Sequence, residues 1–406
     1  MKILLTGANG YIGMRLLPKL LEAGHQLVCA VRNRERFSID EETKALVDIL
    51  EIDFLKPVEP GLLPSDLDVA YFLIHSMSSS TTDFDDMEAA TAENFNAYVA
   101  DTQIKQVIYL SGIVNKENLS KHLWSRKNVE RILSEGPYTL TVLRAGIIVG
   151  SGSSSFEIIR DLCEKLPVMI TPKWVLTKTQ PIAIRDVIHF LTAALGQPQT
   201  YNNSFDIAGP DVLTYKQMLE QYAQVRGFKN WIFTVPVMTP KLSSYWLYFV
   251  TSTSYKLALN LVDSMKIEVV ARDNKLAQLL NIQTKTYKEA IALAFRKIEQ
   301  NLVVSSWKDS MVSGRIKENL EKHIQVPKYG VLKDKKSVHI QNREAVLNNI
   351  WKIGGTNGWY YGDWLWQIRG FLDKLNGGVG LRRGRTHPDK ISAGDALDFW
   401  RVLLAD

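Results

Sequence analysis

The stretch that decides the fold is Gly7-Ala8-Asn9-Gly10-Tyr11-Ile12-Gly13. It follows the short apolar run Ile3–Leu5 and opens Tyr11–Ala23, where apolar residues recur at helical spacing. Each glycine suits a dinucleotide pyrophosphate for its own reason. The first permits a tight turn, the second lets backbone N–H groups approach phosphate, and the third lets helix and strand pack closely. The stretch therefore predicts dinucleotide binding, and an ordinary strand-to-helix turn is the alternative.

Strand-like and helical segments alternate through roughly the first 150 residues. The strand-like runs are short, rich in branched residues and bounded by turn signals: Ile3–Leu5, Gln26–Val31, Val47–Ile52, Val69–Ile74, Gln106–Ser111 and Tyr138–Arg144. Helical spacing covers Tyr11–Ala23, Asp83–Asp101 and Ser125–Glu135. This alternation predicts an α/β fold, a doubly wound parallel sheet with helices on both faces.

The rest of the chain divides by composition. We expect a first domain over residues 1–300, with a smaller lobe at about residues 151–300 that we assign to the substrate, then a polar connector at residues 301–336 and a separate aromatic-rich module at residues 337–406. The lobe follows a flexible Gly/Ser-rich loop at residues 150–155. Its predicted elements are helices at Phe156–Leu166, Arg185–Leu195, Val262–Leu280 and Thr286–Glu299, and a short strand near Gln180–Ile184.

Composition restricts the partners. Among 406 residues, 49 Lys and Arg stand against 43 Asp and Glu, a formal net charge of +6 without any basic run, so we expect no nucleic-acid partner. Cys29 and Cys163 lie in apolar segments and make neither a disulfide framework nor a metal site, which fits a reducing compartment.

The most apolar stretch, Ser244–Val262, is interrupted by Lys256 and Asn260, and a membrane span needs about 20 nearly uninterrupted apolar residues. We therefore predict a soluble, cytoplasmic protein without a transmembrane segment. In it, this stretch forms one or two buried helices.

The residues after the second strand bear on the cofactor. NAD enzymes place an acid there for the ribose 2′-OH, whereas a cation accommodates a 2′-phosphate. This chain has Val31-Arg32-Asn33-Arg34, without an acid. A guanidinium binds phosphate bidentately, so Arg32 favours NADP, with NAD as a possible cofactor. Solvated surface arginines are the alternative.

The G-x-x-G-x-x-G spacing and the Thr6-Gly7-Ala8 start resemble the extended and atypical short-chain dehydrogenases/reductases, including NmrA-like and epimerase-like members. Three further stretches match over about residues 1–300: Leu110-Ser111-Gly112, Leu143–Gly150 and Gln180–Val187. The resemblance implies an NAD(P)-binding Rossmann domain with Ser111 as the active-site serine. It also implies that Asp53 contacts the adenine amino group, although a loop cap has the same sequence signature.

The catalytic Tyr-x-x-x-Lys pair of that superfamily is missing. Its segment, Leu119–Lys127, contains no tyrosine, and His122 and Arg126 occupy two positions four residues apart on one helix face. His122 is a candidate general acid near neutral pH. An exposed His and Arg on a polar helix are the alternative. The departure places the chain with atypical members, some of which are reductases and others NADP binders without turnover.

His75 ends the fourth predicted strand. The carboxyl ends of parallel strands form the ligand crevice, so His75 is a candidate contact to the nicotinamide or the substrate. A hydrogen-bonded structural histidine is the alternative. We find no metal-binding spacing among the histidines.

The C-terminal stretches Trp351–Trp366, Gly377–Arg385 and Gly394–Val402 resemble a domain of unknown function that is often fused to atypical short-chain dehydrogenases. That domain is assigned to the START-like helix-grip superfamily, an α+β fold in which a sheet wraps a long helix and encloses an apolar cavity. Against the family, we expect an incomplete module here. Its tryptophans either fill the core or stack on a ligand.

Together these features predict an NADP-dependent oxidoreductase of the atypical short-chain type. Its substrate is an unidentified small or apolar carbonyl or epimerisable molecule. The alternative is a non-catalytic NAD(P)-binding sensor or assembly factor, because the missing pair favours binding without chemistry.

Overall fold

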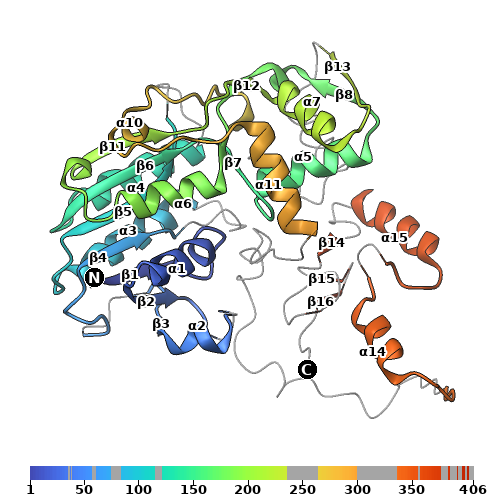
Figure 1. Cartoon of the computed structure of the whole chain (residues 1–406), viewed down its shortest axis with the longest axis horizontal. Helices are drawn as coiled ribbons and strands as arrows, with labels where there is room; N and C mark the ends of the chain where they lie inside the picture. The colour runs from blue at the N-terminus through green and yellow to red at the C-terminus, as the bar shows by residue number, and fades with distance from the viewer. Residues whose placement is uncertain are drawn as a thin grey trace. The chain divides into compact units, whose positions relative to one another are not determined.

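The structure is a computed structural model of the whole chain (Figure 1). It describes residues 1–34, 37, 39–56, 61–74, 84–114, 121–235, 264–299, 336–354, 357–375, 383–384, 391, 396–397 and 400–401. The chain divides into two compact units, Met1–Trp307 and Lys308–Asp406.

A seven-stranded sheet forms the centre of the first unit. Its strands are β1 (Lys2–Thr6), β2 (Gln26–Val31), β3 (Val47–Glu51), β4 (Val69–Phe72), β5 (Gln106–Gly112), β6 (Thr139–Ala145) and β11 (Asn203–Ile207). They lie in the order β11-β6-β5-β4-β1-β2-β3, with every neighbouring pair parallel. The order changes direction between β1 and β4, and ligands of doubly wound sheets bind at such a switch point. The α/β prediction is confirmed.

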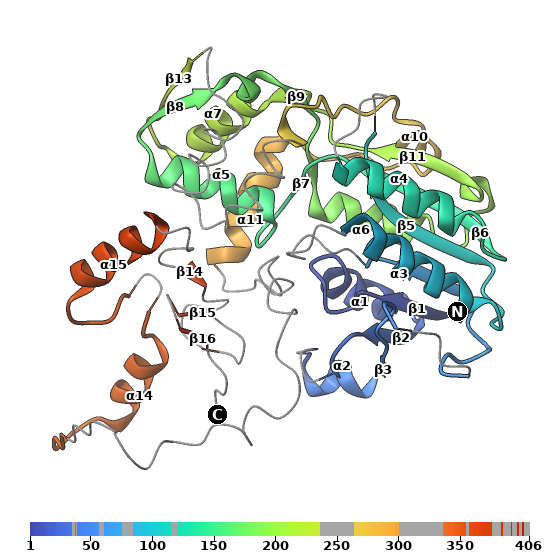
Figure 2. The same ribbon diagram turned by 180° about the vertical axis from the view of Figure 1, so that it is seen from behind.

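Helices cover both faces of the sheet. In Figure 1 the near face carries α1 (Gly13–Glu22) and α6 (Ile184–Ala193), and the view from behind in Figure 2 brings α3 (Phe84–Val99) and α4 (Lys121–Leu133) to the front. Each face has its own apolar core. One includes Leu16, Leu20, Val187 and Leu191, and the other includes Phe72, Phe95, Tyr109 and Val129. Burial on both faces explains why the central strands β1, β2 and β4 are almost wholly apolar rather than alternating. The short helix α2 (Glu41–Ala45) precedes β3.

A second lobe of the same unit follows β6. It contains α5 (Ser154–Lys165), β8 (Val168–Pro172), η2 (Lys173–Leu176), α7 (Tyr215–Arg226), β13 (Trp231–Val235) and α11 (Tyr287–Glu299). The short strands β7 (Ile148–Val149), β9 (Lys178–Thr179), β10 (Ile182–Ala183) and β12 (Leu213–Thr214) pair as β7–β10 and β9–β12. η3 (Pro198–Thr200) and α10 (Lys275–Leu279) complete the unit's described elements. The lobe has its own core, in which Phe156, Tyr222 and Phe295 pack ring against ring.

The helix predicted for Val262–Leu280 is wrong over most of its length. Within residues 264–280, α10 is the principal helix, and residues 268–274 before it are not helical. The backbone N–H of Ala271 donates to Gln180 Oε1 at 3.0 Å, and Val269 forms a β-bridge with Thr179. These tertiary hydrogen bonds replace the ones that a helix would have made. The apolar stretch Ser244–Val262 lies outside the described residues.

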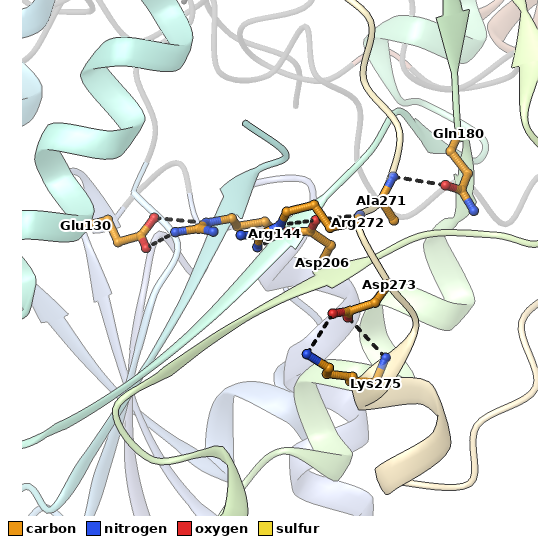
Figure 3. Close-up of polar contacts among 8 residues, drawn as sticks. All are labelled: Glu130, Arg144, Gln180, Asp206, Ala271, Arg272, Asp273 and Lys275. Atoms are coloured by element: carbon orange, nitrogen blue, oxygen red, sulfur yellow. Dashed lines mark hydrogen bonds and ion pairs between the residues drawn. The ribbon is translucent and has the colours of Figure 1, made fainter. Parts of the chain in front are cut away.

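Two ion pairs close the β11 edge of the sheet (Figure 3). Arg272 donates to the carboxylate of Asp206 from Nε and Nη2, each at 2.8 Å, and from its backbone N at 2.9 Å. Beside it, Arg144 on β6 forms a bidentate pair with Glu130 on α4. Asp206 and Arg144 are register partners on adjacent strands, and the Asp206 side chain is only 1% exposed. The two pairs therefore join α4, β6, β11 and the segment before α10.

The second unit contains α14 (Arg343–Trp351), α15 (Asp363–Leu375) and three short antiparallel strands, β14 (Arg383–Gly384), β15 (Ala396–Leu397) and β16 (Trp400–Arg401). Trp359 stacks on Trp366 with ring centroids 5.4 Å apart. Trp364, by contrast, is 63% exposed, so core filling does not explain every tryptophan here. The START-like fold stays a prediction for this unit. Within the described residues, no helix has both the length and the apolarity to cross a membrane.

Asp206→Asn is expected to lower the free energy of unfolding by about 1–3 kcal/mol, because a neutral amide replaces the buried carboxylate that accepts three hydrogen bonds. Chemical denaturation followed by circular dichroism measures the change. Glu135→Gln is the matched control, since it removes the exposed Glu135–Arg131 pair and is expected to cost no more than about 0.5 kcal/mol. Equal losses in both variants would contradict this account of the sheet edge.

Candidate functional site

The glycine turn between β1 and α1 is held against the end of β4. Gly7 has φ 65°, in the left-handed region, and a Cβ built on it would lie 2.9 Å from the carbonyl oxygen of Leu73. Both facts require glycine at this position. The Thr6 hydroxyl donates to Tyr71 O at 2.9 Å and accepts from Leu73 N at 3.2 Å, which fixes the turn to the neighbouring strand.

The other two glycines differ in the space around them. A Cβ on Gly13 would lie 2.4 Å from Gly7 O and 2.7 Å from Ala8 O, so the start of α1 packs directly on the turn. A Cβ on Gly10 would meet only Gly7 O, at 3.1 Å. The protein therefore leaves room beside Gly10 that a ligand can use. This contrast fits the separate roles that the sequence predicts for the second and third glycines.

The beginning of α1 supplies the charge that a pyrophosphate needs. Gly10 N donates to Gly7 O at 2.9 Å, and Ile12 is the N-cap residue of the helix. Asn9 lies in the turn and is partly buried. The first N–H groups of a helix lack intrahelical acceptors, and the helix dipole adds positive potential there. Residues 7–13 thus form a cradle that fits a dinucleotide pyrophosphate.

Tyr11 and Arg15 join this turn to the loop after β7. The Arg15 guanidinium lies 3.9 Å from the centre of the Tyr11 ring and donates to Tyr11 O and to Ser151 O, each at 2.9 Å. A Cβ on Gly150 would lie 2.7 Å from the Tyr11 hydroxyl. Sequence reasoning missed Arg15, and its one signal was a cation one helical turn after Tyr11.

The Tyr11 hydroxyl is buried and has no hydrogen-bond partner among the described residues. Burial raises the pKa of Tyr11 to about 12, partly offset by the charge of Arg15. The phenol therefore stays protonated near neutral pH. It does not replace the missing catalytic tyrosine as a base there.

Arg32 and Asp53 lie at the ends of adjacent strands, β2 and β3. Arg32 Nε is 3.6 Å from Asp53 Oδ1, and the arginine side chain is 43% exposed. Asp53 Oδ1 also accepts from Leu55 N at 3.2 Å, so the carboxylate caps its loop as well. Arg34 is directed elsewhere, since its guanidinium donates to Ile49 O at 3.0 Å. Of these two arginines, Arg32 is better placed for a ligand at the strand ends.

Ser111 and Arg126 come together beside α4. Ser111 is the register partner of Arg144, whose side chain reaches Glu130 of α4, so Ser111 faces the same helix. The Ser111 hydroxyl is buried, and the Tyr109 phenol lies close to both Ser111 and Arg126, with a pKa raised by burial. Arg126 Nη1 donates to Leu110 O at 3.1 Å, which holds the end of β5.

The two candidate histidines, His122 and His75, have no described side-chain contacts. His122 belongs to the first turn of α4, where the structure describes the backbone but not the side chain. His75 lies outside the described residues, directly after the segment that follows β4.

The described residues hold no group of three or more His, Cys, Asp or Glu that could bind a metal ion. Cys29 and Cys163 are both free and buried, and burial raises the pKa of each thiol to about 12. Neither is therefore a reactive thiolate near neutral pH.

Comparisons with known families agree with the glycine turn. Residues 7–152 match a family described as NAD(P)H-binding, and residues 329–406 match DUF2867, a family of proteins of unknown function. No curated protein matches the chain. The chain thus matches an NAD(P)H-binding family in its N-terminal part and a family of unknown function at its C-terminal end, in the order that the sequence resemblance predicts.

Solved structures show the same fold at low identity. A nucleoside-diphosphate-sugar epimerase from Staphylococcus aureus is 17% identical, with a TM-score of 0.56, over 72% of this chain and 99% of that one. UDP-glucuronic acid 4-epimerase from Bacillus cereus, in complex with UDP-glucuronic acid and NAD, is 16% identical, with a TM-score of 0.55 over 74% and 99%. UDP-glucose 4-epimerase from Thermotoga maritima, with UDP-glucose, is 13% identical, with a TM-score of 0.53 over 74% and 100%.

The glycines predict opposite outcomes for two similar substitutions. Gly10→Val is expected to abolish NADPH binding in calorimetry while leaving the melting temperature nearly unchanged, because the side chain fills the ligand space. Gly13→Val is expected to destabilise the fold by about 1–3 kcal/mol or more, because it overpacks the turn. Normal NADPH binding by a folded Gly10→Val variant would show that the stretch is only a turn.

Proposed function

We propose that this chain is an NADP-preferring oxidoreductase of the atypical short-chain type. Its substrate is a small or apolar carbonyl or epimerisable molecule, bound between the sheet's carboxyl edge and the second lobe. The observation that carries the proposal is the cradle at residues 7–13, where Gly10 leaves ligand space and α1 begins. The structurally similar epimerases support only the fold, because their sequence identity to this chain is low.

The turn, through the backbone of Gly7, Asn9, Gly10, Tyr11, Ile12 and Gly13, holds the pyrophosphate. When bound, the nicotinamide supplies or accepts a hydride. The Tyr11–Arg15–Ser151 contacts keep the turn beside the substrate-side loop. The protein therefore brings cofactor and substrate into one crevice, which is its main contribution to the rate.

Arg32 carries the preference for NADP. Its guanidinium is partly exposed, and its contact with Asp53 is long enough to yield to a 2′-phosphate. Asp53 is then placed to contact the adenine amino group.

Proton transfer falls to Ser111 or His122, with Arg126 holding the end of β5 and His75 as a contact to nicotinamide or substrate. Ser111 offers a buried hydroxyl beside the Tyr109 phenol and α4. His122, one helical turn before Arg126, can exchange a proton near neutral pH.

A second candidate function is non-catalytic NADP binding by a sensor or assembly factor. Two observations favour it. Residues 115–137 contain no tyrosine, and Arg126 is engaged by the carbonyl oxygen of Leu110, whereas a lysine in that place would adjust a phenol's pKa. For residues 337–406 we propose a START-like module with an apolar ligand. For the whole chain we propose a cytoplasmic location.

Arg32→Ala is expected to weaken NADPH binding tenfold or more and to leave NADH binding nearly unchanged, because one charge-assisted hydrogen bond is worth roughly 1.5–3 kcal/mol. Calorimetry with both dinucleotides measures the preference. Arg34→Ala is the control, since that guanidinium is bonded to Ile49 O. Equal affinity of the wild type for the two dinucleotides would refute NADP selection while leaving dinucleotide binding intact.

Catalysis is tested by NADPH oxidation with a panel of carbonyl compounds. Ser111→Ala or His122→Ala is expected to lower kcat about 10²–10⁴-fold without changing NADPH affinity, the signature of a lost general acid. His189→Ala, on the exposed face of α6, is the control. Full turnover in both variants would show that the proposed catalytic site is wrong. Tight NADPH binding without turnover of any compound would favour the sensor.

A further inference from the structure

The outer face of the β8–β13 pair is apolar and exposed. The two strands run parallel, with Trp231 opposite Val168 and Phe233 opposite Ile170. We call these four side chains the β8–β13 face. Trp231 is 65% exposed, Val168 is 54% exposed, and Phe233 and Ile170 are each 55% exposed. Their neighbours along each strand point the other way, since Met169 is fully buried and Ile232 packs against the lobe core. The exposure therefore belongs to a sheet with apolar residues on both sides.

Positive charge is concentrated around this face. Lys173 follows β8, Lys229 precedes β13, and both are exposed. The chain has no carboxylate in residues 165–185 or in residues 221–235, the two stretches that contain these strands. The two stretches hold six cations in all. Lys173 and Lys229 directly flank the two strands, whereas Arg185 belongs to α6 and Arg226 lies over the Phe295 ring.

We propose that the β8–β13 face docks on an anionic lipid surface. Tryptophan and phenylalanine are suited to the boundary between headgroups and acyl chains, and lysines beside them interact with anionic headgroups. Four side chains bury little area, so the attachment is reversible and needs both the apolar and the charged contributions.

A second copy of this chain fits the face less well. A two-fold interface places the same patch on both sides, so Lys173 and Lys229 of one copy would face the same lysines of the other. Like charges across an interface oppose association, whereas anionic headgroups neutralise them. The dinucleotide cradle takes no part in this argument, and the proposal stands or falls independently of the proposed enzyme activity.

Vesicle sedimentation with the full chain tests the proposal. Binding is expected to vesicles of phosphatidylcholine with about a third phosphatidylserine, to be much weaker with phosphatidylcholine alone, and to fall as salt is added. Trp231→Ala with Phe233→Ala is expected to lower the partition coefficient about tenfold or more. Lys173→Glu with Lys229→Glu is expected to do the same.

Matched controls lie on other exposed elements. Trp124→Ala on α4, where the indole is 53% exposed, and Lys44→Glu on α2 are expected to bind vesicles like the wild type. All substituted side chains are exposed, and thermal unfolding checks that each variant is folded. The proposal is overturned if anionic vesicles bind no protein at low salt, or if the face variants bind as well as the controls. It is also overturned if light scattering shows a dimer that Trp231→Ala with Phe233→Ala dissociates, because a second copy then covers the face.

Discussion

The contact on which the rest of this protein depends is the one between Gly13 and the carbonyl oxygen of Gly7. No side chain fits there, since a Cβ would lie 2.4 Å from that oxygen. The absence of a side chain on Gly13 lets α1 begin directly beside the glycine turn and brings the N-terminus of the helix to the carboxyl edge of the sheet. This close approach sets the position of α1, and the proposed ligand contacts, from Arg32 to Ser111, all depend on that position.

Close backbone approaches also attach the second lobe. A Cβ on Gly146 would lie 2.2 Å from Gln180 O, and one on Gly209 would lie 2.5 Å from Pro181 O. The segments that leave β6 and β11 therefore touch the same strand connection. Arg15 adds a polar link, because it bonds to the glycine turn and to Ser151 at once. The glycine turn and the loop after β7 are thus held together through Arg15.

The chemistry of the crevice is unusual for this fold. A buried phenol is present at Tyr11, but burial raises its pKa and it lies beside the glycine turn, away from α4. The α4 side offers the Ser111 hydroxyl and the Arg126 guanidinium, and the Tyr109 phenol beside them is also buried with a raised pKa. The proposed dinucleotide site therefore needs a proton donor other than Tyr11. Elsewhere in the unit, two exposed lysines, Lys173 and Lys229, flank the apolar face of β8 and β13.

The amino-acid sequence by itself determined the alternation of strands and helices, the glycine turn and the position of Arg32, because these depend on local periodicity and on residues adjacent along the chain. The expected strand Gln26–Val31 matches β2 residue for residue. Only the tertiary structure decided the backbone conformation of residues 264–274. Their branched residues suit either a helix or an extended chain, and hydrogen bonds to Gln180 and Asp206 hold Ala271 and Arg272 outside a helix. The tertiary structure also decided that Arg126 reaches Leu110 O and that Arg15 contacts Ser151. Each of these joins residues far apart in sequence, and only packing specifies such pairings.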